Sequence, residues 1–152
     1  MAGRDEQVAV VVCVYGVDPE VVSRLGLSDK DAVHVVVRVR TGDGEPLVLE
    51  ENYLPESLLP GLLGEDLGGS LYALLHERYG VWVARSRQEL EPTPLDSRTA
   101  LLGVRPNVPA LRVTRVAWDA EGRAVEFARD LHPGDRMLFV SETYRTPHPD
   151  SP

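Results

Sequence analysis

Two arginines, Arg38 and Arg40, have the residue type and spacing that most clearly suggest a binding site in this sequence. They lie two apart in the segment AVHVVVRVR, which has the composition of a β-strand. Residues two apart on a strand share a face, so Val37 and Val39 fall on the opposite face, which suits the core. Parallel guanidinium groups can each hold a phosphate or carboxylate through paired hydrogen bonds. The pair therefore predicts an anion-binding face, and the open alternative is a solvated strand face.

Glu50 is the candidate partner of these arginines, because a tight turn brings its segment beside theirs. Residues 41–44 (TGDG) form a hairpin turn signal, and residues 46–54 (PLVLEENYL) are the expected antiparallel strand. Glu50 can form a salt bridge with either arginine in the empty protein and can accept hydrogen bonds from a ligand. Its neighbour Glu51 points to the opposite face and is expected at the surface.

Ser70 and Tyr72 mark the expected start of a helix that ends at Gly80. A helix N-terminus presents free N–H groups and a partial positive charge, so it can hold an anion. Gly68 and Gly69, just before it, would let a ligand approach the backbone closely. The simpler reading, a serine N-cap followed by a packing tyrosine, stays open.

The elements that must position these residues form an α+β fold: one antiparallel sheet with helices packed on it. A helix is expected between the N-cap Asp18 and Gly26, and another between Asp96 and Gly103. Residues 55–69, rich in proline and glycine, are expected to form a loop that orders over the ligand. Strands are expected at residues 8–15, 32–40, 46–54, 81–92, 109–119, 123–131 and 137–145.

Composition and charge limit the classes of partner. The chain has 152 residues and a formal net charge of −8, with a single lysine, Lys30. No basic stripe is visible, so this chain by itself should not hold DNA. No apolar run approaches the roughly 20 residues that cross a bilayer, and no signal peptide is apparent. A cytoplasmic location without membrane contact is the expectation.

Metal ions and cofactors are not expected. The lone cysteine, Cys13, lies in the apolar run 8–15, and we expect it to be a buried structural residue. The four histidines are scattered, without the spacing of a metal site. No glycine-rich nucleotide loop follows a strand, and no nucleophile–base pair is recognisable, so catalysis is not expected either.

The order of these elements resembles the UTRA effector-binding domain of GntR-family transcription regulators of the HutC subfamily. The likeness covers roughly residues 8–142. Its first block has a helix ending in Leu-Gly, an Arg-x-Arg strand, a DGEP turn and a strand ending in Tyr-x-Pro. The second is SLYALLHERYG, with a Ser-x-Tyr helix start. The third has an Ala-x-x-Leu helix, the hairpin DAEGRAVE and a closing Gly-Asp-Arg.

The resemblance implies a chorismate lyase-like fold, with a tail at residues 1–7, the domain at 8–145 and a disordered tail at 146–152. It implies a homodimer that binds a small-molecule effector, such as a sugar phosphate or another anionic metabolite. DNA would be bound only through a winged-helix domain that this chain lacks. The chain is then either part of a longer regulator or a separate sensor. The alternatives are a chorismate lyase-like enzyme and a dimerisation module without a ligand.

The resemblance also implies roles for individual residues. Arg38, Arg40, Glu50, Ser70 and Tyr72 match positions that contact the ligand in relatives. Two further residues follow in the last third of the chain: Glu126 matches the glutamate of the hairpin motif, and His132 stands where many relatives have tyrosine. Asp135 and Arg136 match a closing Asp-Arg that anchors a turn, while Trp82 and Trp118 are expected in the core or at a dimer surface.

Overall fold

One six-stranded antiparallel sheet, with strand order β1-β2-β3-β6-β5-β4, forms the body of the molecule. The computed structural model describes residues 4–94, 103 and 108–145. Neither α-helix in these ranges is long enough to cross a membrane. The elements in chain order are β1 (Arg4–Val14), α1 (Pro19–Leu25), β2 (Val33–Gly42), β3 (Glu45–Pro55), the 3-10 helices η1 (Glu56–Leu58) and η2 (Leu62–Gly64), α2 (Leu71–Tyr79), β4 (Arg85–Thr93), β5 (Ala110–Trp118) and β6 (Ala124–Pro133).

Both α-helices begin and end where the sequence predicts. The Asp18 carboxylate accepts a hydrogen bond from the Glu20 amide at the start of α1, and Gly26 ends that helix in the left-handed conformation. The Ser70 hydroxyl caps α2 and left-handed Gly80 ends it. The two predicted hairpins, β2–β3 and β5–β6, are also present. The α+β prediction is therefore confirmed.

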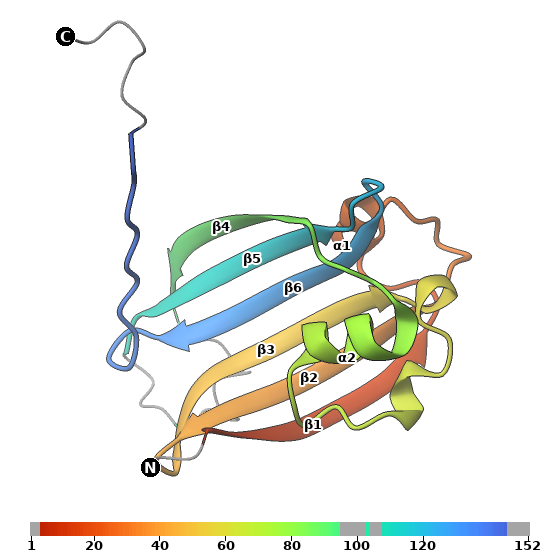
Figure 1. Cartoon of the computed structure of the whole chain (residues 1–152). Helices are drawn as coiled ribbons and strands as arrows, with labels where there is room; N and C mark the ends of the chain where they lie inside the picture. The colour runs from red at the N-terminus through yellow and green to blue at the C-terminus, as the bar shows by residue number, and fades with distance from the viewer. Residues whose placement is uncertain (1–3, 95–102, 104–107, 146–152) are drawn as a thin grey trace, which may run out of the picture.

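The two helices lie on opposite faces of the sheet (Figure 1). Leu71 and Leu75 of α2 pack with Val36 and Leu54 on one face, which we call the α2 face. Val21 and Leu25 of α1 pack on the other face, where the buried core also contains Val33, Val116 and Phe127. The α1 face also carries Val39 and Leu49, as expected for residues that alternate with Arg38 and Glu50.

Residues 55–69 are anchored to the sheet, which corrects the expectation of a loop that orders only over a ligand. Leu59 and Leu62 are fully buried, and Leu67 is 6% exposed. The His34 ring nitrogen Nε2 lies 2.9 Å from the Leu59 carbonyl oxygen. Three leucines distributed through the segment supply enough buried apolar area to fix it. We call residues 55–69 the strap.

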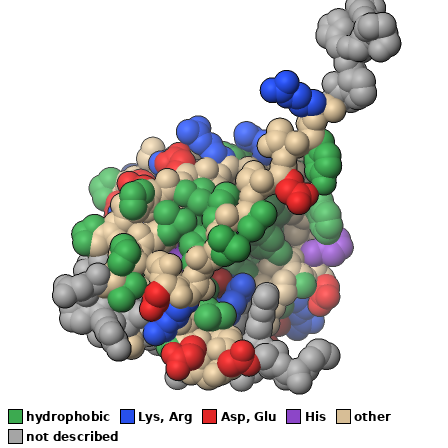
Figure 2. Space-filling model, turned by 90° about the vertical axis from the view of Figure 1, so that its left-hand side faces the viewer, with side chains coloured by type: hydrophobic (Ala, Val, Ile, Leu, Met, Phe, Trp, Pro, Cys, Tyr) green, Lys and Arg blue, Asp and Glu red, His purple; other side chains and the backbone are tan. Residues whose placement is uncertain are grey.

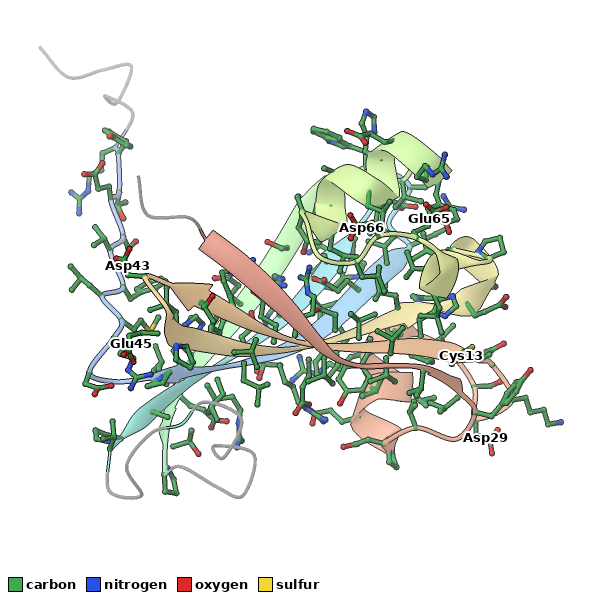
Figure 3. All side chains as sticks on the ribbon, turned by 90° about the horizontal axis from the view of Figure 1, so that it is seen from below. Cys13, Asp29, Asp43, Glu45, Glu65 and Asp66 are labelled. Carbon is green, nitrogen blue, oxygen red and sulfur yellow. The ribbon has the colours of Figure 1, made fainter. Side chains whose placement is uncertain are left out.

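Several local predictions are wrong at the edges of the sheet. Strand β1 begins at Arg4, so residues 4–7 are strand rather than tail. Because β1 is an edge strand, Cys13 is exposed rather than buried; it lies far from the β2–β3 turn at Asp43 (Figure 3). Residues 81–84 precede β4 instead of belonging to it, and residues 137–145 are extended but unpaired. The helix predicted after Asp96 and the tail 146–152 lie outside the described residues.

Glu51 and the strand position expected for Trp82 also differ from expectation, whereas Trp118 lies on β5 at the margin of the core, as expected. Glu51 is only 9% exposed and accepts a hydrogen bond of 3.0 Å from the Tyr53 hydroxyl, because the α1 face is covered as well. Trp82 is 64% exposed, outside any strand, with its ring edge-on to His76.

Replacing Leu62 with alanine tests whether the strap is part of the core. Loss of a fully buried leucine should lower the free energy of unfolding by about 2–5 kcal/mol in denaturant titrations. Leu90→Ala on β4, where the side chain is 37% exposed, is the matched control and should cost much less. Equal costs for the two variants would show that the strap is not packed as described.

Candidate functional site

A pocket of about 530 Å³ opens on the α2 face, between the start of α2 and strands β2, β3, β4, β5 and β6. The structure brings all seven predicted site residues to its lining: Arg38, Arg40, Glu50, Ser70, Tyr72, Glu126 and His132. Their role in ligand binding stays a prediction. The same lining contains residues that are not among those predicted from the sequence: Asn52, Gln88, Arg115, Asp130, Met137 and Phe139.

Glu50 bridges the two predicted arginines. Its two carboxylate oxygens lie 2.8 Å from Nη2 of Arg38 and 3.0 Å from Nη2 of Arg40. Arg38 and Glu50 are directly opposite each other on neighbouring strands, so the hairpin register fixes this contact. The salt bridge considered for the empty protein is thus present.

The two arginines have different surroundings. Arg38 is 3% exposed and donates hydrogen bonds to the carbonyl oxygens of Gly69, at 2.9 Å, and Leu67, at 3.3 Å. It therefore ties the end of the strap to the sheet. The Arg40 side chain is 37% exposed, so Arg40 is the arginine that an incoming ligand can reach.

Glu126 is the centre of a second polar group, on β6. It is fully buried and accepts hydrogen bonds from the Tyr72 hydroxyl at 2.7 Å, the Asn52 amide at 3.0 Å and Nε of Arg115 at 3.0 Å. Burial and the neighbouring carboxylate raise the pKa of Tyr72, so its hydroxyl remains a donor. These contacts join α2 to three strands of the sheet.

Asp130 lies beside this group and is the most perturbed acid of the pocket. Nη1 of Arg115 is 3.3 Å from one of its oxygens. Burial raises the pKa of Asp130 to about 7, with Arg115 opposing the effect and Glu50 and Glu126 adding to it. Asp130 Oδ1 and Asn52 Oδ1 are buried without a hydrogen-bond partner among the described residues.

Two predicted residues lie at the margin of these groups. The Ser70 hydroxyl accepts a hydrogen bond of 3.3 Å from the Ala73 amide, so it caps α2 at the rim of the pocket. Burial, Arg40 and Arg115 lower the pKa of His132, which keeps its ring neutral near pH 7. Arg136 donates a hydrogen bond of 2.7 Å to the Pro46 carbonyl, which anchors the turn after β6 as expected.

The additional polar residues of the pocket differ in how far the sequence places them on the α2 face. Asn52 is two residues after Glu50, and Asp130 is four after Glu126, so strand alternation alone places them on the α2 face. Arg115 lies on the predicted β5–β6 hairpin, but a register shift between Ala117 and Trp118 decides which face of β5 lies beside Glu126, and the turn signal alone does not reveal that shift. Among the described residues no three acids, histidines or cysteines are grouped as a metal site would require.

Comparison with known proteins identifies the family of this chain. The family model described as UTRA domain matches residues 5–137. The chain is 29% identical over 122 residues to the HTH-type transcriptional repressor NagR of Bacillus subtilis, covering 80% of this chain and 50% of NagR. It is 35% identical over 119 residues to the repressor PhnF of Mycolicibacterium smegmatis, covering 77% and 48%. The chain thus spans about half the length of these relatives.

Solved structures give the same result. The crystal structure of the effector domain of PhnF from Mycobacterium smegmatis superposes with a TM-score of 0.88 at 29% sequence identity. That match covers 95% of this chain and 89% of the solved chain.

Asp130 should make the stability of the protein depend on pH. Its raised pKa means that the folded chain holds a proton that the unfolded chain releases above about pH 4. This contribution is present at low pH and is lost as the pH rises through about 7. Between pH 5.5 and 8 the free energy of unfolding should therefore fall by about 2 kcal/mol more in the wild type than in Asp130→Asn. Denaturant titrations at the two pH values measure this difference.

The matched control is Asp135→Asn, at an exposed aspartate of the turn after β6. It should show the same pH dependence as the wild type. Parallel pH profiles for the wild type and Asp130→Asn would show that Asp130 is already ionised in the folded protein at low pH.

Proposed function

Because this chain belongs to the UTRA domain family, the effector domains of GntR-type transcription regulators, we propose that its pocket binds a small polyhydroxylated anion as a regulatory signal. The proposal rests on one observation: the pocket combines buried hydrogen-bond acceptors at its floor with an arginine that a ligand can reach. Asn52 and Asp130 supply acceptor oxygens that have no hydrogen-bond partner in the described part of the chain, while Arg40 supplies positive charge. A sugar phosphate or a sugar acid carries both hydroxyl donors and an anionic group.

Each part of such a ligand finds a matching group. Hydroxyls can donate to Asn52 Oδ1 and to Asp130, which removes the cost of leaving these buried acceptors unsatisfied. The anionic group can bind Arg40 and the start of α2, where Ser70 and free backbone amides lie at the rim. Binding of the anion at Arg40 competes with Glu50, so the ligand changes the contacts of the β2–β3 hairpin.

The proposed regulation acts on DNA binding outside this chain. With a net charge of −8 the domain is unsuited to bind DNA itself. In a longer regulator, a homodimer of such domains would hold two winged-helix domains in the cytoplasm. The ligand then changes operator affinity only if it binds two arrangements of the dimer with different affinity.

We propose that the pocket performs no catalysis. Its ionisable groups are held in mutual contacts: Glu50 with two arginines, and Glu126 with Tyr72 and Arg115. The hydroxyl–carboxylate contact among these described pairs, Tyr72 with Glu126, does not activate a nucleophile, because burial and the carboxylate raise the pKa of Tyr72. Release of pyruvate from chorismate by the purified chain would contradict this proposal.

A thermal-shift screen tests the ligand proposal. Sugar phosphates, sugar acids and neutral sugars are added to the purified chain, and a true ligand at about 100 times its Kd should add about 2.7 kcal/mol of stability. For a chain of this size the melting temperature should rise by several degrees. Arg40→Ala should abolish the rise for anionic ligands, because it removes the reachable guanidinium.

Arg112→Ala is the matched control for that variant. Arg112 lies on β5, pairs with Glu91 at 3.3 Å and is not among the residues that line the pocket. The shift should survive in this variant. An undiminished shift in Arg40→Ala would place the anion elsewhere, and the absence of any shift across the panel would favour a dimerisation module without a ligand.

A further inference from the structure

One end of the pocket has an apolar lining that the proposed function does not use. Val48 lies on β3 and Val113 on β5, while Met137 and Phe139 belong to the extended segment after β6. We call these four residues the apolar end. Hydrophobic side chains gather over the end of the sheet from which this segment leaves (Figure 2). A ligand that carried only hydroxyls and an anionic group would leave this part of the lining without a matching group.

Strand register separates the apolar end from the hydrogen-bonding groups near α2. Val48 is directly opposite Arg40 on β2, and Asn52 is four residues further along β3, about 13 Å away at the usual rise of a strand. The Arg40 guanidinium is 3.0 Å from Glu50, which lies between Val48 and Asn52 on β3. An anionic group held by Arg40 and hydroxyls held by Asn52 therefore occupy the part of the pocket nearer α2, and the apolar end lies beyond them.

Phe139 offers the apolar surface that a ligand can cover. It is 54% exposed although it lines the pocket, whereas Val48 and Val113 are 4% and 6% exposed. The two valines therefore form a closed floor, and Phe139 lies beside it with part of its ring in water. Covering this ring with an apolar group is favourable because it removes apolar area from water. A sugar hydroxyl at the same place would lose its hydrogen bonds to water and gain none from these side chains.

His132 adds a neutral ring to this end of the pocket. It lies on β6, between the strands that carry Val48 and Val113. Burial together with Arg40 and Arg115 lowers its pKa, so the imidazole is uncharged near pH 7. A neutral ring accepts an apolar neighbour without the cost of desolvating a charge. The described groups at this end therefore favour an apolar substituent over a second charge on the ligand.

We propose that the effector carries an apolar substituent, an aryl group or a short alkyl chain, which packs against Phe139 over Val48 and Val113. The inference rests on the proposed function, because the anionic group at Arg40 fixes where the substituent lies. It narrows the class of ligand to a sugar phosphate or sugar acid that is substituted at a hydroxyl remote from the anionic group. Phe139 then determines which anions the pocket prefers, while Arg40 determines that it binds anions.

Isothermal titration calorimetry of the full chain with matched pairs of compounds tests the substituent. Each pair shares its sugar and its anionic group: methyl and phenyl β-D-glucuronide, and the 6-phosphates of methyl and phenyl β-D-glucoside. In at least one pair the phenyl compound should bind about tenfold more tightly than the methyl compound, because it buries additional apolar area. Phe139→Ala should bring the two affinities of that pair close together, because it removes the exposed ring.

Leu138→Ala is the matched control for this variant. Leu138 is 86% exposed, precedes Phe139 and is not among the residues that line the pocket, so the preference for the phenyl compound should survive. Equal affinities within both pairs, or a preference that persists in Phe139→Ala, would overturn the substituent and leave anion binding intact. A chain that binds an unsubstituted anion of the thermal-shift panel but none of the four compounds has no room for the substituent, which also overturns it. A chain that binds neither group of compounds overturns the proposed function as well.

Discussion

Burial of three carboxylates on one face of the two central strands is the constraint on which the structure depends. Glu50, Glu126 and Asp130 are 8%, 0% and 6% exposed. A buried carboxylate without compensation costs several kcal/mol, and removal of one partner of a buried pair is strongly destabilising. The neighbouring strands must therefore supply Arg38 and Arg115 at matching register. The pocket lies above these polar side chains.

The same constraint connects the pocket to the strap. Arg38 contacts Glu50 through one nitrogen of its guanidinium and the carbonyl oxygens of Leu67 and Gly69 through another. The strap ends at the N-cap of α2. Because Arg38 contacts both Glu50 and the end of the strap, a change in the ion pairs of Glu50 affects the segment that leads into this helix. A ligand that takes Arg40 away from Glu50 leaves Arg38 as the remaining described cation on that carboxylate. The proposed ligand would therefore act on the hairpin, the strap and α2 together.

Local signals explain what the sequence could predict. Helix caps depend on single side chains, and hairpin turns fix the register of adjacent strands, so the Arg38–Glu50 contact followed from the sequence. Arg115 could not be predicted to meet Glu126, because the register of the β5–β6 hairpin shifts by one residue between Ala117 and Trp118, and no local pattern reveals that shift. Cys13 was placed in the core because an apolar run does not distinguish an edge strand from a central one. Residues 137–145 have the alternation of a strand, but alternation alone does not show whether a neighbouring strand pairs with them.

The net charge of the pocket depends on the protonation state of its buried acids, and this charge affects which ligand the proposed site would favour. Three arginines face three carboxylates, so the pocket is neutral when Asp130 is ionised and carries one positive charge when Asp130 is protonated. His132 contributes no charge near pH 7, because burial and the nearby arginines lower its pKa. With its pKa at about 7, Asp130 is poised between the two states. An anion in the pocket favours the protonated state by Coulombic repulsion, and protonation in turn strengthens anion binding by the same free energy. A neutral sugar lacks this reciprocity, so under the proposed function Asp130 would help Arg40 to favour a charged ligand over a neutral one.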